Sequence, residues 1–134
     1  MIVLDAAAMV DVVLDQSAKH WVLEQLRGQV VCAPAHQPAE VLSAIARLRR
    51  ADEIDDQVAQ AALLEVDDLE QELVPPTGAH MTRALELQER VHFLDGLYVA
   101  LAAERKCPLV TTDHRLARAE PPCQVHVPDE PEAT

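Results

Sequence analysis

Short runs of strand length alternate with helix-length amphipathic segments along the chain, and this alternation is the feature that most constrains its fold. The strand-like runs cover residues 2–4, 30–33, 109–112 and 124–127. Between them, apolar residues recur every three or four positions, which is the spacing of helices. Strands that alternate with helices form a parallel sheet covered on both faces. The sequence therefore predicts an α/β fold with three layers and a central, mostly parallel sheet of four to five strands.

The expected helices are marked by apolar spacing and by Pro, Gly and Ser at their ends. We predict helices over residues 6–14, 17–27, 38–48, 81–87, 94–104 and 114–118. The acidic stretch 53–73 also carries apolar residues at helical spacing, so it predicts one or two amphipathic helices with a solvated acidic face.

A chain of 134 residues is long enough to bury one sizeable core. We predict a single domain over residues 1–127 and an acidic, Pro-containing flexible tail over residues 128–134. A signal peptide needs an uninterrupted apolar stretch, whereas acidic residues interrupt the apolar start of this chain. No run approaches the roughly 18 apolar residues of a membrane span. We expect a cytoplasmic protein without membrane contact.

The formal net charge of −12 is unusual for a protein that binds nucleic acid, but most of the excess is local. Nine of the 23 acidic residues lie between Asp52 and Glu72, and three more lie in the tail. Elsewhere acids and bases are equal in number. The total charge therefore does not exclude a nucleic-acid substrate.

Two acids directly follow predicted strands: Asp5 after residues 2–4 and Asp113 after residues 109–112. Because the carboxyl ends of parallel strands meet at one edge of the sheet, where ligands bind, we expect both acids at that edge. Glu40 and Asp95 lie in the first turns of predicted helices that open onto the same edge. Each acid alone also fits a turn residue or a favourable charge on a helix dipole.

Carboxylates that converge repel one another and imply a cation. Oxygen ligands favour Mg²⁺ or Mn²⁺, and such ions support hydrolysis of phosphodiester bonds. Cys32, Cys107 and Cys123 match no zinc or disulfide pattern, so we expect buried thiols. Thr112 is a candidate to bind a ligand carboxylate or metal-coordinated water through its hydroxyl, with Thr111 as the second candidate.

Four segments, IVLDAAAMV, PAEVLSAIARL, LDGLYVALA and PLVTTD, together resemble PIN-domain ribonucleases of the VapC toxin family over nearly the whole chain. The resemblance implies a PIN-like fold in which Asp5, Glu40, Asp95 and Asp113 are the metal-binding and catalytic carboxylates. It also implies Mg²⁺ or Mn²⁺ as cofactor, an RNA substrate such as tRNA or ribosomal RNA, a VapB-type antitoxin that blocks the pocket, and a homodimer.

The chain departs from the family pattern at three positions near the acids. Ala7 stands where a hydroxyl residue is common, Ser43 where Asn is frequent, and Leu94 where an aromatic residue often precedes the third acid. These changes keep an alternative open, namely a catalytically weak PIN-like module that binds RNA or protein. A phosphatase with an aspartyl nucleophile is disfavoured, because it needs a second acid where Ala7 stands.

Basic and imidazole side chains also lie near the four acids in the sequence. We expect Arg115 and Arg118, which follow Asp113, to be the arginines closest to RNA phosphates. His36, His92 and His114 are expected in turns or at the surface, because water activated by a metal needs no imidazole base.

Overall fold

Five strands form one sheet in the order β3-β2-β1-β4-β5, and every neighbouring pair is parallel. The strands are β1 (Ile2–Leu4), β2 (Val31–Pro34), β3 (Glu72–Val74), β4 (Leu109–Val110) and β5 (Val125–His126). The structure, a computed structural model, describes residues 1–130, so residues 131–134 of the predicted tail lie outside the described residues. The predicted α/β class and the parallel sheet are confirmed.

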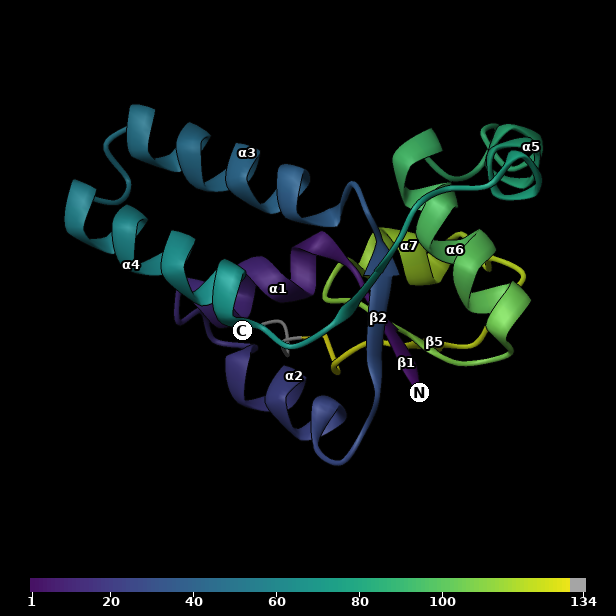
Figure 1. The fold of residues 1–134 in the computed structure, drawn as a ribbon, viewed down its shortest axis with the longest axis horizontal. Coiled ribbons are helices and arrows are strands. Elements are labelled where there is room, and N and C mark those ends of the chain that lie inside the picture. Colours follow the sequence, from purple (N-terminus) through teal and green to yellow (C-terminus); the bar gives the residue numbers. More distant parts are fainter. Residues whose placement is uncertain (131–134) are drawn as a thin grey trace.

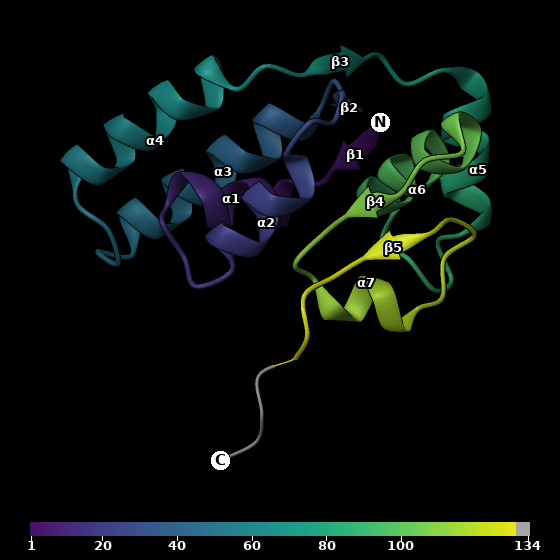
Figure 2. The same ribbon diagram turned by 90° about the horizontal axis from the view of Figure 1, so that it is seen from below.

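Helices cover both faces of this sheet (Figures 1 and 2). They are α1 (Ala6–Val13), α2 (Lys19–Leu26), α3 (Gln37–Arg50), α4 (Asp56–Asp68), α5 (Gly78–Glu86), α6 (Phe93–Arg105) and α7 (His114–Arg118). Figure 2 shows α1 to α4 on one side of the strands and α5 with α6 on the other. Within residues 1–130, the helices are all too short or too polar to cross a membrane.

Alternate residues of the central strands point into two separate cores. Ile2 and Leu4 pack in the core formed with α1 to α4, whereas Val3 packs in the core formed with α6. The neighbouring strands follow the same period of two, with Val31 and Val110 in the first core and Cys32 and Leu109 in the second. Both faces of the central strands are therefore apolar, which explains why these segments are continuous apolar runs in the sequence.

The edge strand β3 corrects the prediction of helix throughout residues 53–73. Helix α4 ends at Asp68, and residues 72–74 pair with β2 in the register Cys32↔Glu72 to Pro34↔Val74. This strand is three residues long and mostly exposed, so it has no apolar alternation that the sequence could reveal. The acidic side chains of α4 face solvent, as predicted.

The order of the strands reverses beside β1. The chain runs outward from β1 to β2 and β3, and then returns to place β4 and β5 on the other side of β1. The backbone N–H of Asp5 donates to the carbonyl of Val110 on β4, with 3.2 Å between N and O. In open parallel sheets, ligands bind outside the carboxyl ends of the strands at such a reversal. The ends of β1 and β4 therefore place Asp5 and the residues after Val110 at this point.

Candidate active site

Asp5 is a buried carboxylate that also begins a helix. It follows β1 directly, and its Oδ1 accepts a hydrogen bond of 2.9 Å from the N–H of Ala8, which caps α1. The residue is only 3% exposed. The pKa of Asp5 is raised to about 7. Burial is the largest cause; contacts with Thr111 and Ala8 lower the pKa, and the charges of Asp95 and Asp113 raise it. This carboxylate therefore lacks the cationic partner that would hold it ionised.

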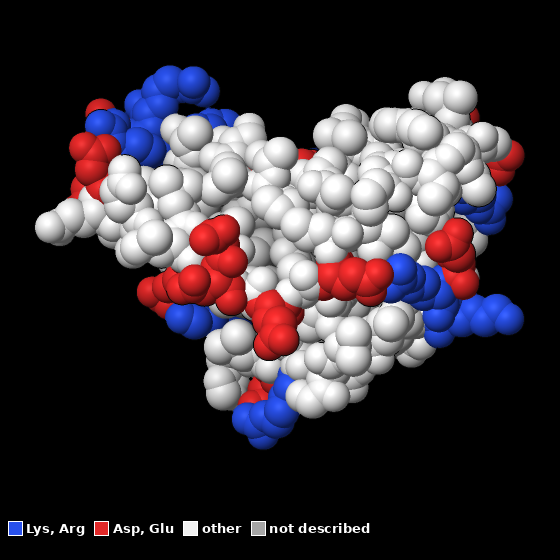
Figure 3. Space-filling model, in the orientation of Figure 1, with Lys and Arg blue, Asp and Glu red and all other residues white. Residues whose placement is uncertain are grey.

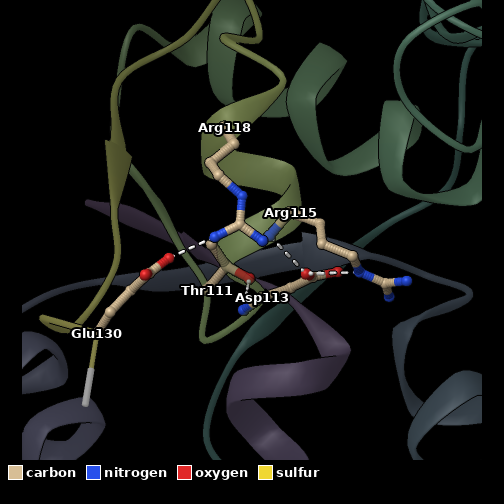
Figure 4. Close-up of polar contacts among 5 residues, drawn as sticks. All are labelled: Thr111, Asp113, Arg115, Arg118 and Glu130. Atoms are coloured by element: carbon tan, nitrogen blue, oxygen red, sulfur yellow. Dashed lines mark hydrogen bonds and ion pairs between the residues drawn. The ribbon is translucent and has the colours of Figure 1, made fainter. Parts of the chain in front are cut away.

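Asp113 caps the next helix at the same edge of the sheet. Its Oδ1 accepts from the N–H of Arg115, at 3.0 Å, and the Arg115 side chain approaches the same oxygen at 3.4 Å. The N–H of Asp113 donates to the hydroxyl of Thr111, at 3.0 Å (Figure 4). Because Thr111 also contacts Asp5 and helps to lower its pKa, this one side chain connects the two strand-end acids.

Glu40 lies in the first turn of α3, and two aromatic rings hold one of its oxygens. The hydroxyl of Tyr98 donates to Oε1 at 2.8 Å, and Nε2 of His36 lies 3.0 Å from the same atom. The two rings pack against each other, with centroids 4.9 Å apart. Burial by itself raises the pKa of Glu40, but contacts with His36 and Tyr98 outweigh it, so the pKa is lowered overall. Glu40 is thus held as a carboxylate.

Asp95 occupies the first turn of α6 and faces the other acids. Burial raises its pKa, and the charges of Glu40 and Asp113 raise it further. Among the residues that the structure describes, no side chain or backbone N–H donates a hydrogen bond to the Asp95 carboxylate. Its environment is therefore acidic and only weakly compensated.

These four acids line one pocket of about 950 Å³, which we call the acidic pocket. The acids come from four helix N-termini, those of α1, α3, α6 and α7, whose partial positive charges partly offset the carboxylates. In the space-filling view a hollow lies between α3 and the α5–α6 pair (Figure 3). Within residues 1–130 no three acidic, His or Cys side chains converge closely enough to hold one metal ion. Repulsion among carboxylates favours that spread.

The other residues predicted near the site are placed as follows. Ala7, Ser43 and Leu94 all line the acidic pocket, so the three departures from the family pattern lie at the site itself. Neither Thr111 nor Thr112 is among the residues that line the pocket. Thr112 interacts with Asp11 on α1, whereas Thr111 contacts Asp5 and Asp113, two of the pocket acids.

Two further residues were not expected at the site from the sequence. His36 lies in a turn, as predicted, but its imidazole is only 19% exposed and contacts Glu40 and Tyr98. Tyr98 is 1% exposed, as expected of a core residue, yet its hydroxyl reaches Glu40. The apolar stripe of α6 identifies Tyr98 as a core residue and carries no signal for this contact.

The fold and the pocket define a class of protein: a parallel α/β domain with carboxylates gathered where the order of its strands reverses. The PIN domain family matches residues 2–120 of the chain. Ribonuclease VapC1 of Mycobacterium tuberculosis is 38% identical over 125 residues, which cover 92% of this chain and 94% of that protein. The chain therefore belongs to the PIN-domain family and, within it, to the VapC group.

Two solved structures share the fold at low sequence identity. VapC20 of Mycobacterium tuberculosis, described as a toxin that cleaves the sarcin-ricin loop, has a TM-score of 0.68 at 16% identity, with 90% of this chain and 96% of that chain covered. VapBC2 from Rickettsia felis, solved with a DNA fragment from its promoter, has a TM-score of 0.66 at 16% identity, with 95% and 98% covered.

Proposed function

We propose that this chain is a metal-dependent endoribonuclease that acts as the toxin of a VapBC-type pair in the cytoplasm. The observation that carries the proposal is the acidic pocket, in which Asp5, Glu40, Asp95 and Asp113 come from four separate segments. The relatives' names support the reaction, because VapC1 is named a ribonuclease at 38% identity. From the same sequence similarity we infer a VapB-type antitoxin as partner and a homodimer. The solved structures of low sequence identity support the fold alone.

The donor atoms fit Mg²⁺ or Mn²⁺, since the pocket offers carboxylate oxygens and no thiolate. Asp5, Asp95, Asp113 and Glu40 would hold the ion. When bound, it neutralises charge at the scissile phosphate and lowers the pKa of coordinated water. Burial is the main cause of the raised pKa values of Asp5 and Asp95, and repulsion from neighbouring acids adds to both; a bound cation would offset that repulsion.

The residues around the acids would orient them for this task. One oxygen each of Asp5 and Asp113 is used in a helix cap, and in Asp113 this leaves the second oxygen for a ligand. Tyr98 engages Oε1 of Glu40 and leaves Oε2 available. Thr111 would fix Asp5 relative to Asp113, and Thr112 remains the sequence's candidate to bind a ligand carboxylate or coordinated water.

Purified protein with Asp95→Asn tests the proposal. We expect the rate of RNA cleavage in Mg²⁺ or Mn²⁺ to fall by more than roughly 100-fold, the upper loss typical when a residue that only orients a metal ligand is mutated. Asp67→Asn, an exposed change on α4, removes the same charge away from the pocket and should cleave like the wild type. Unchanged cleavage by the Asp95→Asn protein, or full activity in EDTA, would refute metal-dependent catalysis at these acids.

A second candidate is a PIN-like module that binds RNA or protein but cleaves weakly, and Ala7 and Ser43 in the pocket wall favour it. Ala7 lacks the hydroxyl common in the family, and Ser43 has a hydroxyl in place of the Asn amide, so the groups that could orient the acids differ. Calorimetric titration separates the two candidates. Uptake of Mn²⁺ by the wild-type protein supports the nuclease, and RNA binding without metal uptake supports the module.

A further inference from the structure

Most basic side chains of this protein are already paired with acids. Within residues 1–130, seven Lys and Arg side chains form ion pairs with carboxylates, namely Lys19, Arg27, Arg49, Arg83, Arg105, Arg115 and Arg118. Among those described residues, Arg47, Arg50, Arg90 and Lys106 have no such partner. Arg47 and Arg90 line the acidic pocket, whereas Arg50 and Lys106 do not.

The arginines expected from the sequence to contact RNA are among the paired ones. Arg115 lies against Asp113, and Arg118 pairs with Glu130 of the C-terminal segment (Figure 4). To bind a phosphate, each would have to share or release its carboxylate, which reduces the net gain. Arg47 and Arg90 give up no ion pair when they bind an anion. Their planar guanidinium groups also match phosphate oxygens in a two-point contact.

Arg47 belongs to the same face of α3 as Glu40. Glu40, Ser43, Ala44 and Arg47 follow the spacing i, i+3, i+4 and i+7, and all four line the acidic pocket. Seven residues of helix place Arg47 about 10 Å along the axis from Glu40. A phosphate next to the one at the four acids is therefore within the range of Arg47.

Arg90 reaches the acidic pocket from another part of the chain. It precedes α6, five residues before Asp95, and it is exposed. The hollow seen in Figure 3 separates α3 from the α5–α6 pair, so the two arginines belong to segments on its opposite sides. A strand of nucleic acid laid across the four acids would pass both guanidinium groups.

We propose that Arg47 and Arg90 are phosphate-binding subsites that hold single-stranded RNA on both sides of the cleaved bond. This inference rests on the proposed ribonuclease function and adds the residues that bind the substrate backbone. An acidic pocket repels the polyanion that it must cleave, in a chain whose net charge is −12. Two unpaired cations at its wall supply a local attraction for the RNA backbone beside the acids.

Fluorescence anisotropy with a short labelled single-stranded RNA tests the subsites, in an Asp95→Asn background that prevents cleavage. Arg47→Gln and Arg90→Gln should each weaken binding about tenfold, as expected for loss of a charged hydrogen-bonding group. Each should also reduce the slope of log Kd against log salt concentration by about 0.7, the value for one phosphate contact on a single strand. The double variant should show twice that reduction in slope.

Arg50→Gln is the matched control, because Arg50 is exposed, unpaired and on the same helix, yet outside the acidic pocket. It should leave both the affinity and the slope unchanged. If Arg50→Gln weakens binding as much as Arg47→Gln, general charge and not a subsite holds the RNA, and the inference is overturned. If wild-type protein cleaves RNA while both pocket variants bind normally, only the subsites are refuted. Absence of RNA binding by the wild type would refute the proposed function as well.

Discussion

Glu40 illustrates how much of the site is determined by single contacts between distant residues. Its Oε1 is shared by Tyr98, 58 positions later in the chain, and by His36, four positions earlier. The Tyr98 hydroxyl lies in a buried setting, and both burial and the charge of Glu40 raise its pKa, so it stays a proton donor. The hydroxyl therefore fixes the direction of the Glu40 carboxylate.

Removing this hydroxyl should weaken metal binding while the fold is kept. We expect Tyr98→Phe to reduce Mn²⁺ affinity about 10-fold to 100-fold, because groups that orient a ligand typically contribute that much. Phenylalanine retains the ring that packs on His36, so thermal unfolding of the metal-free protein should change little. Isothermal titration calorimetry with Mn²⁺ measures the effect. Equal affinities of the two proteins would show that the contact does not position Glu40.

At the scale of elements, the packing of α5 on α6 depends on one glycine. A Cβ on Gly96 would lie 3.0 Å from both Cα and Cβ of Ala84, so the two helix backbones approach each other at this point. Gly96 is adjacent to Asp95 in the first turn of α6. The close approach of the helices therefore also helps to place a carboxylate of the acidic pocket.

Gly96→Ala should destabilise the protein even though alanine favours helix. The added methyl group meets backbone, and overpacking of this kind costs about 1–3 kcal/mol, against a gain of about 1 kcal/mol in helix propensity. Chemical denaturation should show a lower free energy of unfolding. Gly78→Ala, at the start of α5 with open space around its Cβ, should cause no loss. A Gly96→Ala protein as stable as the wild type would contradict the tight contact.

The elements differ in how far the sequence determines them. Strands β1 and β4 were predictable because both of their faces are buried and each run ends at an acid. Strand β3 was not, since its three residues become a strand only through pairing with β2. An ion pair supports it from the other layer, where Arg105 at the end of α6 binds both oxygens of Glu72 at 2.8 and 3.1 Å. That contact joins residues 33 positions apart and leaves no local pattern.

At the scale of the whole molecule, the sheet brings together acids that the sequence could only place one by one. Strand-end positions predicted Asp5 and Asp113 at one edge, whereas Glu40 and Asp95 depended on family resemblance. All four line the acidic pocket. Arg47 and Arg90 could not be selected from the sequence, because what distinguishes them is that they line the acidic pocket and form no ion pair among the described residues. Pairing between side chains is decided by packing and not by spacing along the chain.

The contribution of Asp5 to the stability of the metal-free protein should decrease as the pH rises. The pKa of Asp5 is about 7 in the folded protein, against its usual 3.8, so between these values the folded state binds more protons than the unfolded state. The contribution of Asp5 to the free energy of unfolding is therefore fully present below about pH 4 and is lost as the pH rises through 7. Asp5→Asn keeps a helix-capping oxygen and should be more stable than wild type at pH 8, by up to about 4 kcal/mol.

Chemical denaturation of both proteins in EDTA, at several pH values, measures this difference. The gain of the Asp5→Asn protein should grow from about pH 4 to about pH 7 and stay constant above it. Groups that do not interact with Asp5 titrate alike in both proteins, so the difference between the two curves reports Asp5 together with its coupling to Asp95 and Asp113. A gain that does not vary with pH would mean that Asp5 is ionised in the folded protein without a metal.

The direction of the parallel strands also decides where this protein can be modified safely. Because β1 begins at Ile2, the exposed Met1 lies at the amino end of the sheet, away from the acidic pocket at the carboxyl ends. The C-terminal segment, by contrast, contacts α7 through Pro128 and Glu130. An affinity tag or a surface-immobilisation linker therefore belongs at the N-terminus, where it leaves the route of a substrate to the four acids open.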